Sequence, residues 1–71
     1  MSREFSVVIE RDEDGFYVAS VPSLPGCHTQ ARSLDDLMAR IREAIELQLD
    51  DRNDDDDQLE FVGVQRITIA A

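Results

Sequence analysis

The 71-residue sequence has no lysine and no tryptophan, and it has few cysteines, prolines and glycines. All seven basic residues are arginine, against 16 acidic residues, which gives a formal net charge of −9. Nucleic-acid binding relies on cations that displace phosphate counterions, so we expect no direct binding to DNA or RNA. The same charge repels anionic membrane surfaces and favours a basic protein partner.

A single cysteine, Cys27, cannot form an internal disulfide, which fits a reducing compartment and predicts a cytoplasmic protein. The sequence shows neither a signal peptide nor an apolar run long enough to span a membrane. Its hydrophobic fraction of 42% is too high for a disordered acidic tail. We expect one domain over residues 1–71, with a core so small that self-association would help to stabilise it.

Alternating apolar and polar residues predict three strands in the first half of the chain, over residues 4–11, 16–21 and 27–32. Asp14-Gly15 lies between the first two and favours a hairpin turn, because glycine adopts positive φ freely. Residues 22–26 contain two prolines, which lack the backbone N–H that a strand ladder needs. They predict a stiff, kinked connection to the third strand.

A helix is predicted to begin after Ser33, a good N-cap, with Asp36 three residues later as an acidic version of the capping box. Apolar residues then recur at helical spacing up to residue 49 and form a single stripe. The stripe consists of Leu34, Leu37, Met38, Ile41, Ala44, Ile45 and Leu49. Residues 50–58 are mostly aspartate, and they predict that the helix ends in an acidic loop.

Residues 59–69 return to strand character, with apolar residues in both phases, which predicts a bulge near Gly63 or Gln65. The expected fold class is therefore α+β with the order β-β-β-α-β. A right-handed crossover would place the fourth strand parallel to the first, in a mixed four-stranded sheet of order 3-2-1-4 with the helix on one face. The uncovered face would carry Val8, Phe16 and Val18, and we expect a second subunit to cover them in a homo-oligomer, either a dimer or a tetramer.

Catalytic and metal-binding patterns are weak. The acidic hairpin residues Glu10, Asp12, Glu13 and Asp14 lack the later glycine and glutamate of a calcium-binding loop. Cys27 and His28 are adjacent, so a strand would point their side chains to opposite faces. We therefore expect no catalytic residues, no metal, no cofactor and no enzymatic activity, with Cys27 in the core and His28 at the surface.

Several segments together resemble the HicB-like antitoxin family over about residues 5–50. The most specific is Pro22-Ser23-Leu24-Pro25-Gly26-Cys27, which follows the acidic hairpin and precedes the Ser33-Leu34-Asp35-Asp36-Leu37 helix start. The resemblance implies a partial ribonuclease-H-like fold without catalytic metal ligands. It also implies the function of neutralising a cognate HicA toxin, a small basic ribonuclease that cuts mRNA, by occluding its catalytic histidine and RNA surface.

Many members of that family carry a C-terminal DNA-binding region. Here residues 59–71 are expected to form one strand, which leaves no room for such a region, so we do not expect operator binding. From charge alone, the predicted toxin-binding residues are Glu10, Asp12, Asp14, Tyr17 or the neighbouring Phe16, and Asp54 and Asp55 within the run 54–57. The alternatives are a stand-alone oligomeric module with an unknown partner and a degenerate metal-dependent nuclease.

Overall fold

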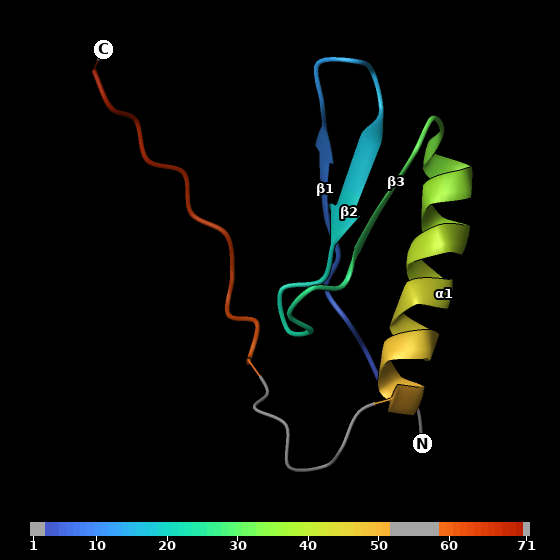
Figure 1. Ribbon diagram of the computed structural model, residues 1–71. Coiled ribbons are helices and arrows are strands. Elements are labelled where there is room, and N and C mark those ends of the chain that lie inside the picture. Colours follow the sequence, from blue (N-terminus) through green and yellow to red (C-terminus); the bar gives the residue numbers. More distant parts are fainter. Residues whose placement is uncertain (1–2, 52–58, 71) are drawn as a thin grey trace.

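The computed structural model describes residues 3–51 and 59–70, and within these ranges it has three strands and one helix. The elements in chain order are β1 (Val8–Arg11), β2 (Tyr17–Ser20), β3 (His28–Ala31) and α1 (Leu34–Asp51). Figure 1 shows α1 lying along one side of the sheet. The α+β class, the order of these four elements and the single helix-covered face are therefore confirmed.

The three strands form an antiparallel sheet of order β1-β2-β3. Its register pairs Ile9 with Ala19 and Ala19 with Thr29. Directly opposed residues share one face of a sheet. Because Ala19 is fully buried in the core beneath α1, this row marks the helix-covered face.

The connection between β2 and β3 is a compact turn that contributes a core residue. Backbone hydrogen bonds run from Leu24 N–H to Val21 O, from Cys27 N–H to Leu24 O and from Val21 N–H to Cys27 O, each 3.0 Å long. Gly26 has a φ of 83°, which favours glycine. The kinked connection expected from the two prolines is confirmed, and it buries Leu24 between two turn-forming stretches.

Helix α1 begins as its sequence predicts. The Ser33 hydroxyl accepts a hydrogen bond of 3.1 Å from the N–H of Asp36, and the Ser33 carbonyl accepts one of 3.0 Å from the N–H of Leu37. Leu37 and Ile41 are buried against the sheet, and α1 packs on β3 and β2. The helix continues to Asp51, slightly past the expected start of the acidic loop, and residues 52–58 lie outside the described ranges.

The predicted fourth strand is wrong. Residues 59–70 are extended but join no strand, so the described sheet is three-stranded and antiparallel, without the mixed four-stranded order 3-2-1-4. The predicted bulge near Gly63 or Gln65 is wrong for the same reason, and the ribonuclease-H-like arrangement that the resemblance implies is not shown by this three-stranded sheet. The alternating pattern predicts only extended backbone, whereas a strand also needs a partner edge, here one distant in the chain, whose pairing costs loop-closure entropy.

Candidate protein-binding surface

The turn between β1 and β2 is held together by the carboxylate of Asp12. Its Oδ1 accepts hydrogen bonds from the N–H of Asp14 at 3.0 Å and from the N–H of Phe16 at 2.9 Å. Two backbone bonds, from Asp12 N–H to Phe16 O and from Gly15 N–H to Asp12 O, close the same turn. Gly15 has a φ of 89°, as the hairpin prediction requires. Asp12 therefore has a structural role, which the charge argument for toxin binding overlooked.

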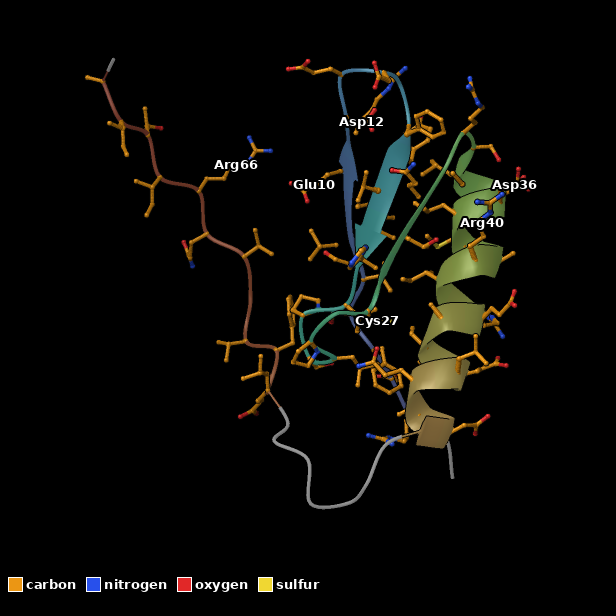
Figure 2. All side chains as sticks on the ribbon, viewed as in Figure 1. Glu10, Asp12, Cys27, Asp36, Arg40 and Arg66 are labelled. Atoms are coloured by element: carbon orange, nitrogen blue, oxygen red, sulfur yellow. The ribbon has the colours of Figure 1, made fainter. Side chains whose placement is uncertain are left out.

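The other hairpin acids are free to meet a partner. Glu10, Glu13 and Asp14 are exposed, and Figure 2 shows Glu10 on β1 with Asp12 at the adjoining turn. Carboxylates on a closed turn are better ordered than those on a flexible loop. The hairpin therefore presents a fixed negative patch.

The sheet face opposite α1, which we call the back face, joins this patch to apolar side chains. The register places Glu10 opposite Val18 and Val8 opposite Ser20, so both rows lie away from the helix. Phe16 is half-buried, and the guanidinium of Arg32 lies 4.7 Å from the centre of its ring. Val8 and Val18 are half-buried too. These positions agree with the face predicted for Val8, Phe16 and Val18, whereas a second subunit over it stays a prediction.

Tyr17 does not belong to this surface. It pairs with Ala31 on the helix-covered face, where it is half-buried and packs against the core. The guanidinium of Arg11 lies 5.5 Å from its ring centre. The structure thus brings Glu10 and Asp14 to one end of the hairpin but directs Tyr17 to the other face. The predicted contacts at Asp54 and Asp55 lie outside the described residues.

Cys27 is buried, and this burial raises the pKa of its thiol. A raised pKa keeps a thiol protonated and unreactive, which suits a core residue. His28 is exposed on the back face, as expected. Within the described ranges, no group of three or more histidine, cysteine or acidic residues is placed to hold a metal ion. Among the same residues, no helix has both the length and the apolar character needed to cross a membrane.

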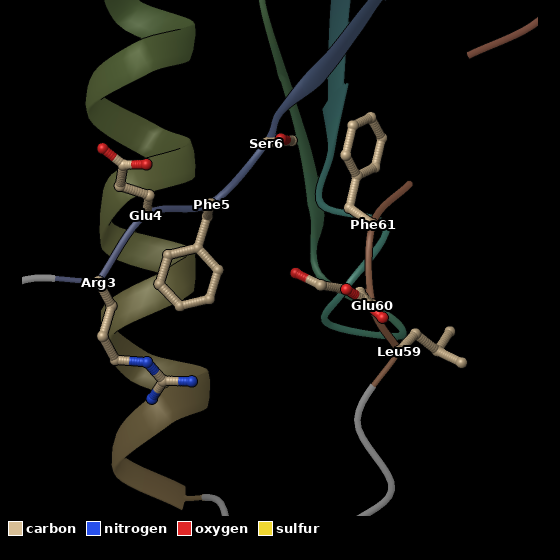
Figure 3. Close-up of a pocket in the computed structure, with 8 residues that line it drawn as sticks. Arg3, Glu4, Phe5, Ser6, Leu59, Glu60 and Phe61 are labelled. Carbon is tan, nitrogen blue, oxygen red and sulfur yellow. The ribbon is translucent and has the colours of Figure 1, made fainter. Parts of the chain in front are cut away.

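Two hollows were not foreseen. One, of about 630 Å³, lies between the chain before β1 and residues 38–49 of α1, where Phe5 and Val7 face Ile45 and Leu49. The sequence signal for this hollow is the apolar stripe of α1, which extends to Leu49 and is longer than the part of the helix that the three strands cover. The other, of about 700 Å³, lies between residues 3–6 and residues 59–61 (Figure 3).

The sequence of the chain matches one protein family and several known proteins. Residues 5–68 match the family described as HicB_like antitoxin of bacterial toxin-antitoxin system. A UPF0150 protein of Archaeoglobus fulgidus is 59% identical over 93% of this chain and 94% of its own length. A UPF0150 protein of Synechocystis sp. is 45% identical over 94% of this chain and 96% of its own length. A UPF0150 protein of Thermoplasma acidophilum is 34% identical over 96% of this chain and 99% of its own length.

The family match covers the hairpin, the compact turn, α1 and nearly all of the extended C-terminal segment. The matched range therefore includes the hairpin, turn and helix start on which the resemblance was based, and also the C-terminal segment that does not pair with the sheet. The chain belongs to the HicB-like antitoxin family of bacterial toxin–antitoxin systems.

Proposed function

We propose that the chain is a non-catalytic antitoxin, which binds a basic HicA-like mRNA-cleaving toxin and neutralises it by covering its active surface. Membership of the HicB-like antitoxin family carries the proposal. The net charge of −9 supports it, because complementary charge speeds the encounter with a basic partner and disfavours wrong partners. An antitoxin that meets an mRNA-cleaving toxin acts in the cytoplasm.

The acidic hairpin is the proposed contact region, with Glu10 and Asp14 as its main carboxylates. Both are exposed, and the hydrogen bonds of the turn fix the backbone that carries Asp14. Asp12 contributes by holding this shape. Asp54 and Asp55 remain candidates for additional long-range attraction.

Self-association is part of the proposal. The half-buried side chains of Val8, Phe16 and Val18 would be covered by a second copy, which would give a dimer or a tetramer. The hairpin turn lies at the end of the sheet, so it can meet the toxin while the back face meets another subunit.

The test is co-expression with the product of a short, basic reading frame beside the gene. We expect a stable complex that dissociates as salt is raised, and relief of the toxin's growth inhibition. The double variant Glu10→Lys/Asp14→Lys should weaken binding at least tenfold. Failure to copurify with the neighbouring protein, together with unrelieved toxicity, would refute an antitoxin role and favour a stand-alone module.

The matched control is Glu43→Lys/Glu46→Lys, which changes the net charge equally at exposed positions on α1. It should retain most of the affinity, because only the long-range attraction is reduced. Equal weakening by both double variants would show that the hairpin is not the contact region.

A further inference from the structure

A C-terminal arm, residues 61–70, is the most exposed apolar part of the described structure. The exposed fractions of Val62, Ile67 and Ile69 are 91%, 83% and 81%. Among the described residues, the arm's backbone forms no hydrogen bond with any other segment. An extended chain with unpaired backbone groups and apolar side chains on both sides has what a strand needs to join a sheet.

The two edges of the sheet differ in how they are covered. At β3, helix α1 packs closely, and the Arg40 guanidinium donates a hydrogen bond of 3.2 Å to the carbonyl of Gln30. Among the described residues, β1 does not contact α1, and β2 is the only strand that pairs with it. Ile9 on β1 is 45% exposed on the helix-covered face of the sheet. The outer edge of β1 is therefore the open edge, with an apolar side chain to cover.

The arm and this edge match in length and direction. Leu59, Glu60 and Phe61 line the same hollow as the chain leading into β1, residues 3–6 (Figure 3). From there the arm runs in the same general direction as β1 without joining it (Figure 1). Ten extended residues span about 33 Å, which is comparable to the nine residues from 3 to 11.

Their charges also match. Arg66 is the only charged residue in the arm, whereas the β1 hairpin carries four acidic residues, Glu10, Asp12, Glu13 and Asp14, and one arginine, Arg11. In the view of Figure 2, the guanidinium of Arg66 and the carboxylate of Glu10 point toward each other from the arm and from β1. A chain of charge −9 repels its copies, so local complementarity of this kind is what close association requires.

We propose that two copies of the chain exchange arms, so that the arm of each copy adds as a strand to the outer edge of β1 of the other copy. The arm does not pair with β1 of its own chain, yet every copy supplies one arm and one open edge. A two-fold dimer can therefore pair both arms and both edges at once. The exchange would cover Ile9 and place Arg66 of one copy near Glu10 of the other. This interface is centred on the outer edge of β1, with Ile9 on the helix-covered face and Glu10 on the back face, and it does not depend on the toxin.

The decisive experiment mixes two charge variants of the full chain. Glu10→Arg carries arginine at both positions 10 and 66, and Arg66→Glu carries glutamate at both. Each alone should dimerise several-fold more weakly than the unchanged protein, because like charges meet. Mixed in equal amounts, they should form a heterodimer in which both interchain contacts are opposite in charge, seen by native mass spectrometry and light scattering.

The mixture separates arm exchange from pairing of each arm with its own β1. Within each variant the intrachain pair is like-charged, so mixing gives no gain if the arm folds back on its own chain. A statistical distribution of homodimers and heterodimers would overturn the proposal, and so would a monomeric unchanged protein at 100 μM, a concentration on the order of those at which weak dimers form.

Apolar burial is tested by Ile67→Asp/Ile69→Asp, which should weaken dimerisation at least tenfold while the helical circular dichroism signal is unchanged. Leu47→Asp is the control, because Leu47 is an exposed apolar residue on α1, 60% exposed, and lies outside the arm. Normal dimerisation of the double variant would contradict the proposal. Equal loss in the Leu47 variant would assign the interface to α1 instead.

Discussion

The β1–β2 hairpin and the C-terminal arm have similar sequence patterns but differ in structure. Both alternate apolar and polar residues, yet the hairpin strands pair and the arm joins no strand of its own chain. The hairpin closes over a short turn that Asp12 and Gly15 stabilise, so pairing costs little loop entropy. The arm lies far along the chain from β1, and a propensity for extended backbone does not by itself supply a partner.

The largest expected effect is on the core that supports the hairpin. Leu37→Ala should lower the free energy of unfolding by about 2–5 kcal/mol, because Leu37 is fully buried between α1 and the sheet. Urea denaturation followed by circular dichroism measures the change. Leu47→Ala, at an exposed position on the same helix, should change it by less than about 0.5 kcal/mol. Similar losses in both variants would mean that α1 packs through a different face.

A smaller effect is expected at the turn before β3. Gly26→Ala should cost about 1–2 kcal/mol, because an L side chain is strained at its positive φ even though the space around it is open. Gly63→Ala is the matched change in the arm, where the space is also open and φ is not positive. Thermal unfolding should show little change for the arm variant. A Gly26 variant of unchanged stability would contradict the left-handed turn.

Asp12→Ala should cost about 1 kcal/mol, because the N–H groups of Asp14 and Phe16 lose their shared acceptor. Asp14→Ala removes the same charge from the same turn, and its side chain accepts neither of these bonds. Its stability should change by less than about 0.5 kcal/mol. Chemical denaturation of the two variants separates the structural carboxylate from the one proposed to bind toxin. A reversed order of the two losses would refute this division of roles.

The smallest effect is expected in the arm. Val62→Ala should change the stability of the dilute monomer by less than about 0.5 kcal/mol, because Val62 is exposed there. Under arm exchange, the loss should grow as protein concentration rises and dimers form. Thermal unfolding at two concentrations, a hundredfold apart, checks both statements. A large loss in the dilute sample would show that the arm already packs within one chain.

Much of the fold was predictable because its determinants are local. Asp14-Gly15 predicted the hairpin, Ser33 predicted the helix start, and the apolar spacing identified Leu37 and Ile41 as core residues. Each rests on backbone conformations and hydrogen bonds formed within a few residues. The sequence motifs also led to the HicB-like antitoxin family, which the match over residues 5–68 confirms.

The toxin-binding residues were less predictable, because charge alone does not distinguish a binding carboxylate from a structural one. Asp12 and Asp14 look equivalent in the sequence, but only the geometry shows Asp12 accepting two N–H groups. Aspartate side chains in turns often accept a hydrogen bond from the backbone N–H two residues later. The position of Asp12 two residues before Asp14 is therefore a sequence signal for its structural role. Tyr17 was predicted as a contact together with Phe16, although neighbouring strand residues point to opposite faces, and it lies on the face that α1 covers.

The amino-acid sequence by itself determined the acidic charge, the family, the hairpin, the helix and the fact that residues 59–69 favour extended backbone. The tertiary structure decided which extended segments pair and which edge remains open. These outcomes depend on contacts between residues distant in the chain, where small burial gains compete with the entropy of ordering the backbone. In the described structure, the arm therefore has strand character but joins no strand of its own sheet.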